Sequence, residues 1–208
     1  MKINFKRFLV FIFLIICAVL ISITSYVSAF SNDVKNSVLR LHIIANSDSN
    51  VDQSLKLKVR NKILEEMKKN NFSSKEDAVK YCSENLDKFK KIAENVVLEN
   101  GFSYPISVEL GSFYFPTKNY SNVSLPAGDY DALRIIIGNG SGHNWWCVMF
   151  PPLCFEGDSS GIISDESKNI LENELSEEEL SLITSEEPEY KVKFKIIEIF
   201  NNLMNNEK

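Results

Sequence analysis

The sequence lacks any excess of positive charge. Its 23 lysines and arginines are outnumbered by 28 aspartates and glutamates, which gives a formal net charge of −5. A general nucleic-acid binder needs a basic surface to neutralise phosphates, so that class is not expected. Internal repeats are also absent. What remains is an ordinary globular composition, 44% hydrophobic and 25% charged over 208 residues, which is enough for one domain with a core.

Histidine is scarce, and this scarcity weighs against a metal centre. A zinc site would need both histidines, His42 and His143, together with Cys147 and Cys154. Six residues separate these two cysteines, whereas zinc motifs usually have two to four, and the histidines fall on different expected elements. We therefore expect no metal, and we expect His42 to be a solvated residue on the polar side of a strand.

Glycine is missing from the position where a calcium loop requires it. Asp48, Asn50 and Asp52 match the first half of such a loop. The turn glycine is replaced by Gln53 and the closing glutamate by Val59. Helix capping explains these polar side chains better than calcium does.

The one glycine-rich run, residues 138–142, is followed by strand-like residues. A phosphate loop leads instead into a helix whose amides hold the anion. No nucleotide or other cofactor is expected.

A catalytic cysteine is not expected either. A reactive thiolate needs an adjacent base, and the base needs an orienting group. His143 lies four residues before Cys147 with no evident partner, and strand alternation turns Cys147 inward. Pro151 and Pro152 can fold the chain back so that Cys154 approaches Cys147, so we expect either a disulfide between them or two free thiols. No catalytic residue is assigned, and we expect a protein that is not an enzyme.

The most informative feature present is a long apolar run near the N-terminus. Lys6 and Arg7 precede residues 8–21, which are fourteen consecutive apolar residues. Small residues follow, and the positions ending at Ala29 suit cleavage of an export signal. Residues 8–27 could alternatively form an uncleaved membrane anchor. Either way, we expect the rest of the chain to work outside the cytoplasm as a secreted or anchored domain.

The exported part predicts an α+β domain. Residues 38–45 alternate as a strand with one buried face, and helices are expected over residues 51–69 and from about 73 to 100. Strands follow at residues 105–115, 131–137 and 145–150, with residues 138–142 joining the last two as a hairpin. This order predicts a mixed β-sheet of about four strands with helices packed over one face, preceded by the hydrophobic N-terminal helix.

The domain limits follow from composition. Residues 1–29 are expected to form the signal peptide or anchor, and residues 30–155 the exported α+β core. Residues 156–189 carry twelve acids against one base and predict an acidic linker or surface segment with a short helix at 176–183. Residues 190–208 are expected to add a C-terminal amphipathic helix to the same domain.

Two adjacent tryptophans, Trp145 and Trp146, point to opposite faces of their expected strand. At least one belongs in the core. The other is a candidate anchor for a protein partner, since exposed tryptophan concentrates binding energy.

Three blocks together resemble a known family. They are LRLHIIANSDSNVDQSLKLKVRNKIL (residues 39–64), LPAGDYDALRIIIGNGSGHNWWCVMFPPLCF (residues 125–155) and EEPEYKVKFKIIEIF (residues 186–200). They resemble the stage II sporulation protein R family of endospore-forming bacteria. The signature blocks include Asn46, Asp48, Asp52, Trp145 and Trp146, which serve either folding or partner binding.

The resemblance implies a secreted intercellular signal rather than an enzyme. Such a protein is exported from the forespore, through the export machinery and signal peptidase, into the intermembrane space. There it contacts a membrane-embedded receptor aspartic protease of the mother cell, which then processes a sigma-factor precursor. The alternatives are an envelope-acting cysteine hydrolase that uses Cys147 and His143, or a septal assembly factor. No nucleic acid and no small-molecule substrate is expected.

Overall fold

The computed structural model describes residues 5–120, 123–153 and 165–184. In chain order these form α1 (Phe5–Ser37), β1 (Leu39–Ile44), α2 (Asn50–Lys68), α3 (Lys75–Glu84), α4 (Leu86–Glu99), β2 (Ile106–Phe115), β3 (Lys118–Tyr120), β4 (Val123–Leu125), β5 (Gly128–Ile137), β6 (Asn144–Phe150), α5 (Asp165–Glu174) and α6 (Glu177–Thr184). The expected α+β class with a mixed four-stranded sheet is confirmed.

The strand order of the main sheet is β2-β5-β1-β6. β1 runs parallel to β5 and antiparallel to β6, while β2 is antiparallel to β5. The expected hairpin between β5 and β6 is wrong, because β1 lies between them. β3 and β4 form a separate two-stranded sheet that the sequence did not predict.

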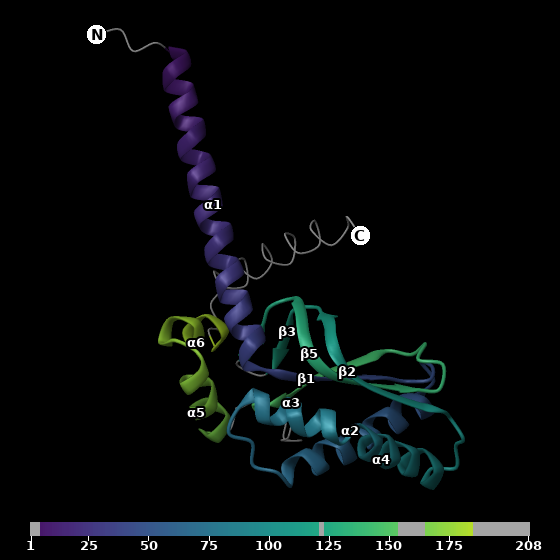
Figure 1. Ribbon diagram of the computed structural model, residues 1–208. Helices are drawn as coiled ribbons and strands as arrows, with labels where there is room; N and C mark the ends of the chain where they lie inside the picture. Colours follow the sequence, from purple (N-terminus) through teal and green to yellow (C-terminus); the bar gives the residue numbers. More distant parts are fainter. Residues whose placement is uncertain (1–4, 121–122, 154–164, 185–208) are drawn as a thin grey trace.

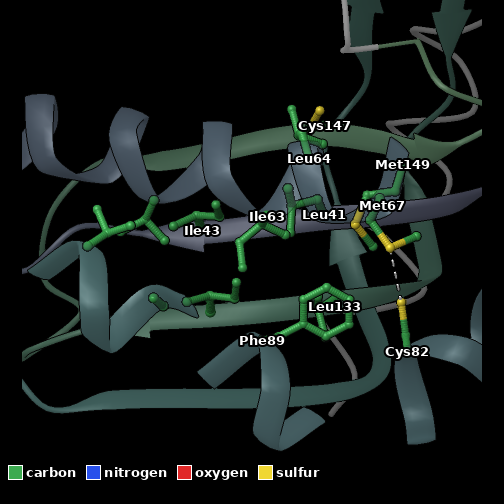
Figure 2. Close-up of a cluster of buried hydrophobic side chains, with 14 of the residues drawn as sticks. Leu41, Ile43, Ile63, Leu64, Met67, Cys82, Phe89, Leu133, Cys147 and Met149 are labelled. Atoms are coloured by element: carbon green, nitrogen blue, oxygen red, sulfur yellow. Dashed lines mark hydrogen bonds between the residues drawn. The ribbon is translucent and has the colours of Figure 1, made fainter. Parts of the chain in front are cut away.

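Both faces of the main sheet are covered, not one as expected. On one side, α2, α3 and α4 enclose a core that contains Leu41, Ile63, Phe89 and Leu133 (Figures 1 and 2). On the other side, a second core gathers side chains from the end of α1, the β3–β4 sheet, α5 and α6. The central strand β1 is consequently buried on both sides.

Helix ends differ from expectation by short distances. The helix expected over residues 51–69 begins at Asn50, and the side chain of Ser49 caps it by accepting a hydrogen bond from the backbone N–H of Asp52. Ser74 caps α3 through the backbone N–H of Asp77. The single long helix expected after residue 73 is divided at Asn85, whose side-chain amide donates to the carbonyl of Tyr81 at 2.9 Å.

α1 is a helix with two environments. Its apolar side chains from Phe8 to Ile21 are largely exposed, whereas Phe30 and Val34 are buried in the second core. In Figure 1 its first part extends well away from the sheet. Among the described residues, no helix combines the length and the hydropathy that a membrane span requires.

The acidic segment contains more structure than the one short helix expected. α6 is confirmed close to its predicted bounds, and α5 precedes it. Leu171 and Leu175 of α5 and Ile183 of α6 are buried in the second core. The expected helix within residues 190–208 lies outside the described residues.

Candidate functional site

The turn that follows β1 is built on the side chain of Asn46. Its amide nitrogen donates to Asp52 Oδ2 at 2.9 Å, and its amide oxygen accepts from the backbone N–H of Asn139 at 3.0 Å. The Ser47 hydroxyl donates to the same Asp52 oxygen at 2.5 Å. These donors hold the pKa of Asp52 below its ordinary value, with the Ser47 hydrogen bond as the largest cause. Asp52 is thereby fixed as a buried acceptor.

A second turn, residues 138–143, is fastened to the first. The Ser141 hydroxyl donates to the carbonyl of Asn46 at 2.7 Å, and the backbone N–H of Gly142 donates to the carbonyl of Ala45 at 2.9 Å. Gly138 has a φ of +60°, and a Cβ there would overlap the Asn46 side chain. We call these two segments, residues 45–52 and 138–143, the joined turns.

Asp48 and His143 close the joined turns on the exposed side. Asp48 Oδ1 accepts the backbone N–H of His143 at 2.6 Å and also contacts His143 Nδ1. The backbone hydrogen bond is the main reason that the pKa of Asp48 is lowered. From the inner side, Lys56 Nζ donates to the carbonyl of His143 at 2.9 Å and to Gln53 Oε1 at 2.6 Å.

The three polar signature residues therefore share one place. The side chains of Asn46, Asp48 and Asp52 hold the joined turns together through hydrogen bonds, and a role in partner binding stays a prediction. Within residues 5–120, 123–153 and 165–184, no group of three or more His, Cys, Asp or Glu side chains is placed to hold a metal ion.

Trp145 and Trp146 face opposite sides of β6, as predicted. Trp145 packs against the helix-covered core, with the guanidinium of Arg60 4.4 Å from its ring centroid. Trp146 lies on the second core, where its ring stacks on His42 at 3.8 Å between centroids. Both indoles are half-buried, so neither is a fully exposed anchor.

The prediction that His42 is solvated is wrong. Its side chain is buried between Trp146 and Phe115, and Nε2 lies 2.8 Å from Asn144 Oδ1. Burial is the main reason that the pKa of His42 is lowered from 6.5, while the Asn144 hydrogen bond acts in the opposite sense. The cause is the second core, which covers the face of β1 that the sequence pattern assigned to solvent.

Arg40, the other polar residue of β1, is completely buried. Its guanidinium carbon lies 4.0 Å from the centroid of Phe115 and 4.8 Å from that of Tyr130, and Nη2 donates to the Tyr120 hydroxyl. Burial lowers the pKa of Arg40. The guanidinium is held by aromatic faces, an arrangement in which a lysine would fit less well.

Cys147 is disulfide-bonded and fully buried. Cys17 and Cys82 are free thiols. The Cys82 sulfur lies 3.9 Å from the Met67 sulfur (Figure 2), and burial raises the pKa of the Cys82 thiol to about 12. Cys154 lies outside the described residues, so its pairing with Cys147 stays a prediction.

Cys147 and His143 do not form a catalytic pair. A disulfide-bonded sulfur offers no thiolate, and His143 lies in the exposed turn before β6 whereas Cys147 is buried. The structure does place an acid against His143, namely Asp48, which the sequence did not reveal. Its effect is to fasten the joined turns.

The contacts of several residues in this region were not predicted from the sequence. Lys56 lies between Leu55 and Val59 on the buried stripe of α2, and a lysine in that position is a detectable signal. For Asn139 and Ser141, the sequence indicated only that they belong to a turn. For Arg40 no signal was available, because alternation along a strand does not report what covers its second face.

Comparison with known proteins identifies the chain. The family model described as Stage II sporulation protein R (spore_II_R) matches residues 35–160. The Stage II sporulation protein R of Bacillus subtilis (strain 168) is 37% identical in an alignment of 159 residues that covers 73% of this chain and 71% of the relative. The chain belongs to the stage II sporulation protein R family.

The match to the stage II sporulation protein R family covers the architecture that carries the joined turns. It begins just before β1, includes both turns and all the strands, and ends at residue 160, within the acidic segment. No solved structure matches the chain. The joined turns and both tryptophans therefore lie within the region that the family model matches.

Proposed function

We propose that the chain is an exported signalling protein of sporulation, which activates a membrane-embedded aspartic protease by protein–protein contact in the intermembrane space. The observation that carries this proposal is the family match over residues 35–160, which supports a signalling role in sporulation. In the proposed sequence of events, the activated protease processes the sigma-factor precursor of the mother cell.

Export from the forespore is supported by the N-terminal helix. Its apolar side chains, such as Phe11 and Ile15, are exposed and contribute nothing to either core. A basic start followed by such a run is what the export machinery and signal peptidase recognise. The disulfide at Cys147 fits an oxidising compartment outside the cytoplasm.

Contact rather than catalysis is supported by the use of the polar signature residues. Asn46, Asp48 and Asp52 stabilise the joined turns, and the sulfur of Cys147 is committed to a disulfide. A ligand of this kind activates its receptor only if it binds the active conformation more tightly than the inactive one. A tenfold shift of that equilibrium requires about 1.4 kcal/mol of differential binding.

The test compares export-blocked and export-competent chains in sporulating cells that lack the native gene. Phe11→Asp combined with Ile15→Asp should interrupt the apolar run and abolish processing of the sigma-factor precursor, measured by immunoblot. The matched control, Phe11→Leu with Ile15→Leu, should process it at the wild-type level. Mass spectrometry of the exported protein should give Phe30 as the new N-terminus.

Two results would contradict the proposal. Precursor processing in the gene-deletion strain at the wild-type rate would show that the chain is not the signal. Undiminished processing by the aspartate variant, with the protein found only in the forespore cytoplasm, would show that export is not needed.

A further inference from the structure

β2 is an edge strand of the main sheet. It pairs with β5 over ten consecutive residues without a register shift, from Ile106 opposite Ile137 to Phe115 opposite Gly128. Among the strands that the structure describes, none pairs with its other side. In Figure 1, β2 lies along one border of the sheet.

The backbone hydrogen bond at the start of β2 fixes which of its backbone groups point outward. The N–H of Gly138 donates to the carbonyl of Pro105 at 2.9 Å, so residue 105 directs its polar groups toward β5. Residues of an antiparallel strand alternate in this direction. The N–H and C=O groups of Val108, Leu110 and Ser112 therefore point away from β5, along the open edge.

Within its own ten residues, β2 lacks the local features that commonly protect edge strands from pairing. Natural edges are commonly blocked by proline, lysine, a bulge or short length. The sequence of β2, ISVELGSFYF, contains no proline and no lysine, and the strand is ten residues long. Its only charge, Glu109, is neutralised by Arg134 on β5, with Nε to Oε1 at 2.6 Å.

The side chains beside the edge determine what kind of segment would fit against β2. Val108 and Leu110 are half-buried on the helix-covered face, while Ser107 and Ser112 are exposed. An incoming strand would meet apolar neighbours at alternate positions and no net charge. The edge thus suits an extended, uncharged segment with apolar residues at every second position.

We propose that the middle of β2, residues 106–112, binds an extended segment of the partner protein by adding it as a fifth strand to the main sheet. Main-chain hydrogen bonds from Val108, Leu110 and Ser112 supply the affinity, and Val108 and Leu110 select apolar side chains. This inference rests on the proposed function, since the partner is the receptor protease activated by contact.

The decisive variant is Ser112→Pro in the full chain. Proline removes the outward N–H of residue 112 and is tolerated where that group faces solvent. Loss of one backbone hydrogen bond of about 1 kcal/mol should weaken binding about fivefold. Ser112→Ala, which keeps the N–H, is the matched control and should bind like the wild type.

Binding is measured by co-purification of the full chain with the receptor protease from membranes, together with cleavage of the sigma-factor precursor. Ser112→Lys, which adds the charge typical of protected edges, is the second variant and should also lose activity. A urea melt of each purified protein reports folding. If Ser112→Pro unfolds, the lysine variant decides.

The outcomes separate this inference from the function on which it rests. A wild-type chain that neither binds nor activates the protease overturns the proposed function. A wild-type chain that activates, with folded Ser112→Pro and Ser112→Lys variants equally active, overturns only the edge-strand site. A wild-type dimer in light scattering that Ser112→Pro converts to a monomer would assign the edge to a second copy of this chain and overturn the proposal.

Discussion

At the scale of single residues, His42 links the fold to pH. It is enclosed by Trp146 and Phe115, and the guanidinium groups of Arg134 and Arg40 add to burial in disfavouring its charged form, while Glu109 opposes them. Its pKa in the folded protein is therefore lower than the ordinary 6.5 of the unfolded chain. Across the pH range between these two values, the unfolded chain binds more protons than the folded one.

We expect the free energy of unfolding to fall as the pH decreases from about 7 through the lowered pKa of His42, because protonation favours the unfolded chain. His42→Phe should keep the stacking on Trp146 but remove this decrease. Urea denaturation at several pH values measures the effect. His143→Gln, which changes an exposed histidine, is the control that should retain the decrease, and an equal slope in the His42→Phe protein would contradict this prediction.

At the scale of elements, the joined turns depend on a glycine at residue 138. Gly138 and Gly101 both have positive φ, +60° and +81°. A Cβ at residue 138 would overlap the Asn46 side chain, whereas one at residue 101 would have no neighbour within 4 Å. The two positions therefore share backbone strain and differ in steric overlap.

Gly101→Ala should cost about 1 kcal/mol of unfolding free energy, since an alanine at positive φ is strained. Gly138→Ala should cost about 2–4 kcal/mol, because overpacking against Asn46 is added to the same strain. The two urea midpoints give the comparison. Equal losses would show that the contact between Gly138 and Asn46 does not hold the turns together.

Elements could be predicted from sequence more completely than their arrangement. The strand around Leu41, the helix around Val59 and the opposite orientations of Trp145 and Trp146 follow from local periodicity. The division between α3 and α4 at Asn85 could not be predicted in this way, because no glycine or proline marks it. β3 and β4 are three residues each, too short for a periodic pattern to register.

At the scale of the whole molecule, α1 belongs to two parts of the protein. Val10 is 57% exposed, whereas Val34 is fully buried. The predicted cleavage after Ala29 would fall just before Phe30, where the buried part begins. The exported domain would then retain the residues of α1 that complete the second core.

Val34→Ala should lower the free energy of unfolding by about 2 kcal/mol, because it removes buried methyl groups from a packed core. Val10→Ala, the same change at an exposed position, should leave stability unchanged. A chain that begins at Phe30 should unfold at the urea midpoint of the full chain. A large loss on removal of residues 1–29 would mean that the apolar part of α1 also stabilises the domain.

The sequence by itself determined the α+β class, the main helices and strands, and the family. These depend on local periodicity, turn chemistry and quoted motifs, which each segment carries alone. Only the tertiary structure decided that β1 enters between β5 and β6 and that a second core buries Arg40 and His42. It also decided that Asn46, Asp48 and Asp52 hold the joined turns together. Such outcomes depend on pairing between residues far apart in the chain, and the alternation within one strand contains no information about what covers its other face.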